Sequence, residues 1–581
     1  MKKIVFSFLM LFSSLSAFSQ ISGKVIDAEA NVTLPGATIM IKGTTTGVIS
    51  GFDGSFIVDA STGDMLAVSF VGYKTIEVEA YDNMIIEMSS EVKSLGEIVI
   101  SSNVIDVARE RETPVAISTI SPSEIQLKVG NMEFPEVMNR TPGVYATKQG
   151  GGYGDSRISL RGFDQRNTSF LINGQPVNDM ENGWVYWSNW QGLTDVASGI
   201  QIQRGLGASR LAVPSVGGTV SIFTKATEVQ KGGNVSQSIG NDGYSKTTIG
   251  YNTGKNEDGW AVSLLMSYWR GNGYVDFTKG EGLNYFGAIG YAPEGSKHAF
   301  NLTFLGAGQW HHQRSAWVSI RDYRNFGDEG IDVRWNTNGG TLNGKEYNMR
   351  RNFYNKPLAT LNWDFQITEN LSLATSLYGS AGRGGGTGPR GNNFRNEDID
   401  LYPFNIDLTE HLNERGRGAA SRNDDGSINF DNVIDVNRNT TDPYTGGISG
   451  FEGELIGSNG FRDDNVNRAV MIRRASMNSH NWIGGISTLD YKKGNWRYSL
   501  GVDLRKYVGY HYRTLEDLMG LDGYFSTGNR NSAGQIQNVT INASPFNNTG
   551  LEREKIDYFN TGIVGWQGVN GLVEYSNPGI W

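Results

Sequence analysis

Strict alternation of apolar and polar residues dominates the chain beyond about residue 230. In three stretches, residues 260–268, 359–365 and 496–504, one face of a predicted strand is apolar and the other is small, polar or charged. This pattern is typical of strands with one apolar and one wet side. The apolar faces consist of Trp260, Val262, Leu264, Met266 and Tyr268; Ala359, Leu361, Trp363 and Phe365; and Trp496, Tyr498, Leu500, Val502 and Leu504.

The connections between these strands alternate in length. Brief turns fall at residues 292–297, 367–370 and 492–495, whereas the intervening segments, about 309–356, 379–479 and 505–557, are long and polar. Alternation alone would also fit a soluble β-sandwich. Short turns on one side and long loops on the other favour an antiparallel transmembrane β-barrel of the outer-membrane type.

The first residues have a different pattern. Lys2 and Lys3 precede an apolar run over residues 4–15, and the small residues Ala17 and Ser19 follow. This order predicts a signal peptide at residues 1–19, with a buried N-terminal strand as the alternative. Since no other apolar run approaches the roughly 18 residues of a spanning helix, membrane insertion must use strands.

Residues 20–90 contain short alternating runs separated by turn signals, which predict a small β-sandwich. The run GKVIDAEANVTLPGATIMIKGTTTG at residues 23–47, followed by DGSF at 53–56 and FVGYK at 70–74, resembles the carboxypeptidase-regulatory-like domain that precedes many receptors. Ser50-Gly51 stands where that family usually has Thr-Asp. The resemblance implies a module without catalytic activity, and the segment has no zinc-ligand pair such as H-x-x-E.

Two pairs of motifs lie between residues 107 and 226. The stretch 157–163 with 170–177, and the stretch 200–205 with 217–225, resemble the plug hairpin and the closing segment of the plug in TonB-dependent receptors. Ser121-Pro122 predicts the start of a helix, so residues 107–226 are expected to be a mixed α/β plug domain. Leu206, where Pro is usual, and Val213-Pro214, which interrupts a usual Tyr-Gly, depart mildly from the pattern.

A short β-branched run lies in the polar linker at residues 91–106, ahead of the plug. Such a run can pair edge to edge with another protein, or it can be the last strand of the preceding sandwich. Its position makes it similar to the TonB box of the family, which implies that it contacts TonB. The residues of this predicted contact are Leu95, Glu97, Ile98, Val99, Ile100 and Ser101.

Glycines beside arginines suggest how the plug docks. Arg161 and Arg204 precede Gly162 and Gly205 at predicted strand ends, where a guanidinium would bridge to carboxylates on the inner barrel wall. A solvated surface charge is the alternative for either arginine. The predicted docking and gating set is Arg157, Arg161, Gly162, Arg204, Gly205, Gly217 and Gly218.

Aromatic residues between the two plug motifs are candidates for ligand contact. They would form a platform at the plug apex, or they would pack against the barrel wall instead. The glycine-rich run at residues 150–155 reads as a plug loop and not as a phosphate cradle, because no Gly-Lys-Ser follows. The candidate ligand residues are Tyr153, Trp184, Tyr186, Trp187 and Trp190.

Composition narrows the chemistry further. The 76 glycines and the 11% aromatic content among 581 residues suit turns and membrane interfaces. The absence of cysteine excludes disulfides and thiolate metal sites, and a net charge of -9 with scattered basic residues argues against nucleic acid. His311-His312 lacks the spacing of a metal site, and no nucleophile with a base is recognisable. We therefore expect no metal, no cofactor and no enzyme activity.

The family resemblance implies energy-coupled import across the outer membrane. A small extracellular ligand would bind the plug apex and loops, and TonB of the inner-membrane complex would pull on the box strand. The favoured ligand is a scarce nutrient of the iron–siderophore type; a glycan or peptide importer and a surface adhesin are the alternatives. Outer-membrane lipid and a surface lipoprotein lid are further expected partners, and the accessory domain would lie in the periplasm.

The barrel is expected to be partial. Residues 227–581 supply roughly ten strands, the last near residues 568–575, which is too few to enclose a plug, whereas the family implies about 22. The chain is therefore predicted to stop near mid-barrel, with a small complete barrel ending at Trp581 as the alternative. The predicted fold is mainly β: a sandwich, a mixed plug, and the N-terminal part of an antiparallel barrel.

Overall fold

The fold was analysed in a computed structural model. It divides into two compact units, Met1–Ile100 and Ser101–Trp581. The predicted signal peptide and the linker with its box-like strand lie outside the described residues. Those residues are 20–28, 32–44, 46–70, 73–89, 116–121, 124–125, 129–130, 132–154, 156–205, 215–224, 231–314, 320, 324, 332–390, 423, 425–439, 456–457, 472–520, 523–526, 535–546 and 554–575.

The first unit is the predicted β-sandwich. One sheet has the order β4-β1-β7 and the other the order β3-β2-β5-β6. Alternate residues of both sheets, including Val25, Ile39, Val58 and Val68, form a core with no exposed surface. The strands are β1 (Ile21–Asp27), β2 (Thr38–Ile41), β3 (Gly47–Ile49), β4 (Ser55–Val58), β5 (Met65–Ser69), β6 (Ile76–Glu79) and β7 (Met84–Met88).

The second unit begins with the plug, whose main sheet has five strands in the order β13-β12-β15-β14-β8. Strands β12 and β15 are parallel and the other pairs are antiparallel, so the sheet is mixed. As predicted from Ser121-Pro122, the Ser121 Oγ accepts a hydrogen bond from the Glu124 N–H at 3.3 Å, although helices in the described part of the plug are only short turns. The elements are β8 (Ile117–Ile120), η1 (Phe134–Arg140), β9 (Val144–Thr147), β10 (Arg157–Leu160), β11 (Phe163–Asp164), η2 (Gln165–Asn167), β12 (Thr168–Ile172), β13 (Gln175–Pro176), η3 (Trp187–Trp190), α3 (Leu193–Val196), β14 (Gly199–Arg204) and β15 (Gly218–Phe223).

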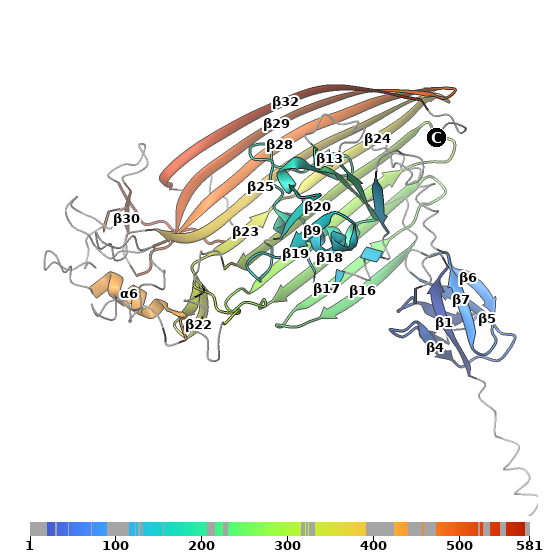
Figure 1. The fold of residues 1–581 in the computed structure, drawn as a ribbon, viewed down its shortest axis with the longest axis horizontal. Helices are drawn as coiled ribbons and strands as arrows, with labels where there is room; N and C mark the ends of the chain where they lie inside the picture. Colours follow the sequence, from blue (N-terminus) through green and yellow to red (C-terminus); the bar gives the residue numbers. More distant parts are fainter. Residues whose placement is uncertain are drawn as a thin grey trace, which may run out of the picture. The chain divides into compact units, whose positions relative to one another are not determined.

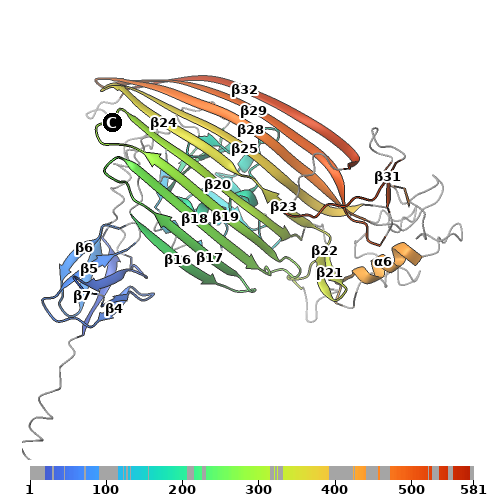
Figure 2. The ribbon, with the colours of Figure 1, turned by 180° about the vertical axis from the view of Figure 1, so that it is seen from behind.

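The wall is an eleven-stranded antiparallel sheet that curves around the plug (Figures 1 and 2). Its strands follow one another in sequence order, except that β23 and β24 both pair with β20 and β25. No helix in the described part of the chain is both long and apolar enough to pass through a bilayer. The strands are β16 (Gly232–Ile239), β17 (Ser245–Asn252), β18 (Trp260–Gly271), β19 (Gly280–Tyr291), β20 (His298–His312), β23 (Arg351–Asn355), β24 (Leu358–Thr368), β25 (Leu371–Arg390), β28 (Ile472–Lys493), β29 (Trp496–Asp517) and β32 (Ile556–Tyr575).

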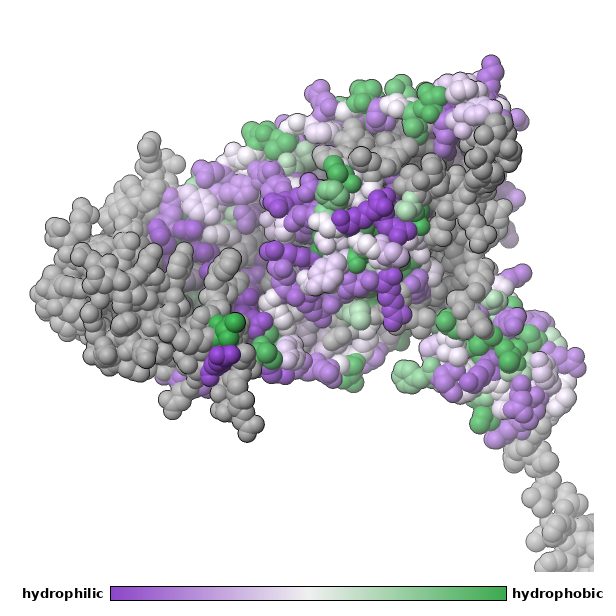
Figure 3. Space-filling view, viewed as in Figure 1, coloured by the Kyte–Doolittle hydropathy of each residue, from purple (hydrophilic) through white to green (hydrophobic). Residues whose placement is uncertain are grey.

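The alternation predicted from the sequence is present in the wall. Leu264 and Met266 on β18 are 57% and 56% exposed, whereas Ser263 and Ser267 on the opposite face are 3% and 1% exposed. Figure 3 shows hydrophobic residues gathered along β32, where Ile563, Val569 and Val573 are exposed. The wall therefore has one apolar outward face and one face turned to the plug.

The three predicted short turns are found, but the strands on the other side extend further than predicted. β25, β28, β29 and β32 run into segments that we expected to be loops, and β32 starts at Ile556 rather than near residue 568. The extensions of β25 and β28 are mostly polar or glycine-rich, so they lack the apolar alternation by which a strand is recognised. The ladder of backbone hydrogen bonds holds them in place without it.

Beyond the long strands lie two small three-stranded sheets and a helix. One sheet has the order β22-β21-β26 and the other β27-β30-β31. Their elements are β21 (Gly339–Leu342), β22 (Lys345–Asn348), β26 (Ile428–Asn429), α6 (Phe430–Asn439), β27 (Ile456–Gly457), β30 (Tyr524–Ser526) and β31 (Gln535–Gln537).

Candidate functional site: the plug and its seats on the wall

A glycine-rich plug loop, residues 150–154, forms the first seat on the wall. A Cβ on Gly154 would come within 2.3 Å of the His311 ring on β20, and one on Gly152 within 2.8 Å of Thr278. Tyr153 packs between Tyr244 and Trp269, with ring centroids 6.3 and 4.9 Å away. The loop can approach the wall this closely at Gly152 and Gly154 because these two residues carry no side chains.

A buried carboxylate holds this loop from the plug side. Glu133 is 8% exposed and accepts hydrogen bonds from the Gly154 N–H and the Ser156 hydroxyl. Burial raises the pKa of Glu133 above its usual value, although both hydrogen bonds act in the opposite direction. The first seat therefore has a titratable group beneath it.

An acidic plug turn at residues 179–182 forms the second seat. The Glu181 Oε2 lies 2.6 Å from the His511 Nε2 on β29, and the Tyr507 hydroxyl donates to the Asp179 Oδ2 at 3.1 Å. Gly509 and Gly562, paired across β29 and β32, form a notch that receives the Glu181 carboxylate. A Cβ on Gly509 would lie 2.8 Å, and one on Gly562 2.0 Å, from the Glu181 Oε1. We call these two residues the glycine notch.

Asp195 at the end of the plug helix α3 makes a third polar contact with the wall. Its carboxylate lies 2.5 Å from the Lys246 Nζ on β17 and accepts a hydrogen bond of 2.8 Å from the Ser267 Oγ on β18. Both side chains of this ion pair are mostly buried, at 13% and 9% exposure. The first and third contacts share β18, whereas the second lies on β29 and β32.

Apolar packing fills the space between these seats. Wall residues including Leu305, Leu358, Trp482 and Tyr507 belong to the same buried cluster as the plug core. The Lys356 ammonium lies 5.3 Å from the ring centres of both Trp190 on the plug and Trp482 on the wall. The plug is therefore held by one apolar contact area and a few polar seats.

The predicted bridges from Arg161 and Arg204 to wall carboxylates are not present. The Arg161 Nη1 donates to the Arg204 carbonyl at 3.5 Å, and the Arg204 Nη1 donates to the Pro142 carbonyl at 3.2 Å. Within the described residues neither guanidinium has a carboxylate partner. The two Arg-Gly turns lie against each other, since a Cβ on Gly205 would come 2.4 Å from the Arg161 Nη1. These two turns therefore stabilise contacts within the plug.

The other members of the predicted docking set also act within the plug. The Arg157 guanidinium lies over the Trp184 ring at 5.2 Å. Gly162 has φ +80° and Gly218 has φ +139°, and a Cβ on Gly218 would lie 2.1 Å from the Gln203 carbonyl oxygen on β14. Gly217 would meet the Thr168 Oγ1 at 2.7 Å. Close approach between plug strands explains these glycines.

The five candidate ligand aromatics do not form one platform. Trp187 and Trp190 are each 2% exposed, and Trp187 packs on Phe134 and Phe170. Tyr153 is 8% exposed within the first seat. Tyr186, at 49% exposure, and the half-buried Trp184 remain at the plug surface. The two tryptophans are buried because they form part of the hydrophobic core of the plug.

Sequence reasoning missed the residues of the second and third seats. Asp179, Glu181 and Asp195 stand between the recognised motifs, and that cluster of acids is the only signal that pointed to them. The partner of Glu181, His511, lies 330 residues away along the chain, so no local pattern connects the two. Among the described residues, no group of three or more His, Asp or Glu side chains could hold a metal ion.

Comparison with known proteins agrees with this architecture. Residues 21–100 match the CarboxypepD_reg-like domain family, and residues 109–219 match the TonB-dependent Receptor Plug Domain family. TonB-dependent receptor P39 of Formosa agariphila is 28% identical over 262 residues, covering 43% of this chain and 23% of its own length. TonB-dependent receptor SusC of Bacteroides thetaiotaomicron is 27% identical over 186 residues, covering 30% of this chain and 18% of its own length.

A third relative carries a ligand class in its name. The probable TonB-dependent siderophore receptor PirA of Acinetobacter baumannii is 26% identical over 208 residues, covering 34% of this chain and 27% of its own length. The chain thus spans only 18% to 27% of the length of these three relatives. The chain therefore carries a carboxypeptidase-regulatory-like domain followed by the plug domain of TonB-dependent receptors, and its named relatives are TonB-dependent receptors.

Proposed function

We propose that this chain takes part in energy-coupled uptake of a small solute through the outer membrane. TonB-dependent receptors interact with TonB and bind small ligands, and the homologues are outer-membrane proteins. The observation that carries the proposal is a plug seated in the curved wall by a few polar contacts, Glu181 with His511 and Asp195 with Lys246 among them. Such contacts hold a plug in place yet can be broken by a modest force.

Residues 95–101 are proposed as the strand that TonB captures. Backbone pairing with an added strand needs free N–H and C=O groups more than particular side chains. Deletion of residues 95–101 in a full-length version should abolish accumulation of the ligand while leaving binding at the cell surface intact. Replacing Val99 with Pro, which removes one backbone donor, should reduce accumulation in the same direction.

The matched control is the substitution Val99→Thr, which keeps the backbone donor and the β-branched shape and should transport normally. Transport that persists after the deletion would contradict the importer. It would favour the alternative, a surface adhesin that binds through its loops and does not need this segment.

An iron chelate of the siderophore type is the ligand we favour. The support is the siderophore receptor among the relatives. A glycan or peptide importer is the second candidate, because accessory domains of this kind often accompany nutrient importers. Growth that depends on the gene under iron limitation, but not when glycan is the limiting nutrient, would separate the two.

The proposed topology follows from the same function. Residues 1–19 direct export, the accessory domain and residues 91–106 lie in the periplasm, and the apolar face of the wall contacts outer-membrane lipid. A surface lipoprotein lid is a further candidate partner. The chain is proposed to act as a transporter and not as an enzyme.

A further inference from the structure

An arginine-rich surface lies on the wall directly beyond the second plug seat. On β29, Gly509 and His511 contact Glu181, and Arg513 is the next residue on the same face. On β28, Ser476 pairs with Arg513, and Arg474 lies two residues further on the same face. On β25, Gly388 pairs with Arg474, and Arg390 lies two residues further on the same face. We call Arg390, Arg474 and Arg513 the arginine cluster.

The arginine cluster shares one acidic partner. The Asp557 Oδ2 lies 3.1 Å from the Arg390 Nε and 2.6 Å from the Arg513 Nη1. Arg474 donates to the Gly386 carbonyl at 3.0 Å, and no carboxylate in the described part of the chain lies within ion-pair distance of it. Three guanidinium groups on adjacent strands therefore face one carboxylate, which leaves an excess of positive charge.

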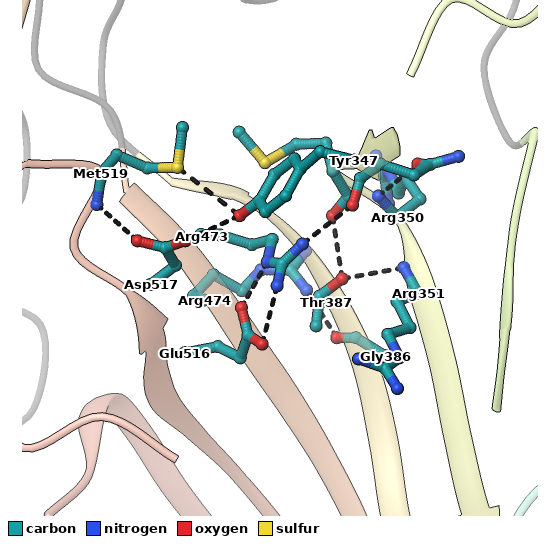
Figure 4. A network of polar contacts seen from close by, with 12 residues as sticks. Tyr347, Arg350, Arg351, Gly386, Thr387, Arg473, Arg474, Glu516, Asp517 and Met519 are labelled. Carbon is teal, nitrogen blue, oxygen red and sulfur yellow. Dashed lines mark hydrogen bonds and ion pairs between the residues drawn. The ribbon is translucent and has the colours of Figure 1, made fainter. Parts of the chain in front are cut away.

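Three other arginines of the wall each have a carboxylate of their own. Arg473, on the opposite face of β28, has its own partner in Glu516, and Arg497 has Asp490 at 3.2 Å (Figure 4 shows the first pair). Arg505 is likewise paired with Asp503. These three arginines are each neutralised by a carboxylate, as expected from the cost of an unpaired buried charge.

The half-buried Arg474 lies against a glycine-rich part of β25. Its guanidinium lies against β25, where a Cβ on Gly388 would come 2.9 Å from the Nη2 (Figure 4 shows Arg474 beside Gly386). The side chains of Arg390 and Arg513 are 34% and 21% exposed, so solvent reaches them. Asp557 is 7% exposed and is fixed between the two arginines. The cluster is partly ordered before any ligand arrives.

We propose that the arginine cluster binds an oxyanion, the carboxylate or phosphate group of a solute that approaches the plug. Planar guanidinium forks bind such groups with two parallel charge-assisted hydrogen bonds, and a ligand charge would neutralise the excess that Asp557 leaves. The inference rests on the proposed uptake function, because it places this group where an incoming solute reaches the plug turn at residues 179–182. A neutral glycan would gain nothing there.

The test is equilibrium binding of inorganic phosphate and of citrate to the purified full chain in detergent, without TonB and without an energised membrane. Arg474→Gln should weaken binding of at least one of the two anions by about tenfold or more, the loss of a charged fork. Raising the salt concentration should weaken wild-type binding in the same way. Phosphate and citrate together distinguish a phosphate-bearing from a carboxylate-bearing ligand.

Arg497→Gln is the matched control, because Arg497 lies on the same wall but is already paired with Asp490, and its binding should equal wild type. Arg474→Lys keeps the positive charge but not the planar guanidinium fork, so its affinity for the anion should lie between those of wild type and Arg474→Gln. This intermediate affinity separates loss of the site from misfolding. Wild-type binding that is absent, or that Arg474→Gln leaves unchanged, would overturn the site. Anion binding that depends on Arg474, together with uptake that persists after deletion of residues 95–101, would instead overturn the transport proposal and leave the binding site standing.

Discussion

At the scale of single residues, the glycine notch makes the sharpest prediction about plug docking. A Cβ on Gly562 would lie 2.0 Å from the Glu181 Oε1, so Gly562→Ala should push the Glu181 carboxylate away from His511. We expect a loss of about 1–3 kcal/mol in docking, as for an overpacked contact that also breaks a charged hydrogen bond. Faster hydrogen exchange at residues 179–182 would report it.

Gly565 on the same strand provides the control. Nothing lies within 4 Å of a Cβ at Gly565, so Gly565→Ala adds the same atom without touching the plug. Equal exchange rates in the two variants would show that the notch does not hold the turn.

The carboxyl group beneath the first seat predicts a pH dependence. The pKa of Glu133 is raised by burial, so the folded protein binds this proton more tightly than the unfolded chain. This tighter proton binding adds to the free energy of unfolding. The contribution is fully present below the pKa of about 4.3 in the unfolded chain and is lost as the pH rises through the raised pKa of the folded protein. Thermal unfolding should therefore show wild type losing stability relative to Glu133→Gln as the pH rises from about 4 to about 8.

Glu133→Gln removes the titration but keeps the shape of the side chain, so Gly154 and Ser156 retain partners. If the wild type instead became more stable relative to Glu133→Gln as the pH rises, this result would contradict the raised pKa of Glu133.

At this scale the sequence predicted which glycines matter but rarely what they touch. Gly162, Gly205 and Gly218 were singled out, and each does have a positive φ. Their arginine neighbours were assigned to the wall, yet Arg161 and Arg204 bond within the plug. A partner brought close only by the fold, such as His511 for Glu181, leaves no trace in local sequence.

At the scale of elements, the glycine-rich loop at residues 150–154 links conformation to docking. Gly154 has φ +88°, and its Cβ would meet the His311 ring, whereas Gly162 has φ +80° and open space around it. In both alanine variants the left-handed backbone conformation should lower the free energy of unfolding by about 1–2 kcal/mol. Gly154→Ala should lose a further 1–3 kcal/mol, roughly, because it also unseats the loop from β20.

Chemical unfolding of the two variants side by side measures that difference. The same loss in both would mean that the contact with His311 contributes nothing beyond the backbone cost.

Elements were predictable where one face of a strand is apolar and the other is polar. The alternation of apolar and polar residues predicted β18, β24, the first part of β29 and the short turns. It did so because the two faces of each strand require opposite kinds of side chain. The outer halves of β25 and β28 were not predictable, since glycines and polar residues such as Gly384–Gly386 give no periodic signal. Only pairing with neighbouring strands defines them.

At the scale of the whole molecule, the division into two units predicts two unfolding steps. The sandwich core, with Val25 and Val68 at its centre, contains no residue of the second unit. The Tyr73 hydroxyl donates to the Asp27 carboxylate at 2.5 Å inside the first unit. Tyr73→Phe should lower the melting temperature of one calorimetric transition, that of the sandwich, and leave the other unchanged.

A single transition that shifts as a whole in Tyr73→Phe would contradict independent units. Ser22→Ala, which removes the Ser22 hydroxyl's exposed hydrogen bond to Asp82, is the control and should move the sandwich transition much less.

The place of β8 in the plug sheet has a mechanical consequence. β8 is one of the two edge strands, is the first described strand after residues 95–101, and is paired with β14 through only four residues, Ile117–Ile120. A load applied through residues 95–101 would reach this short ladder before any other part of the plug. β8 would then detach first, and single-molecule pulling should record a small initial extension while the other four strands of the sheet stay folded.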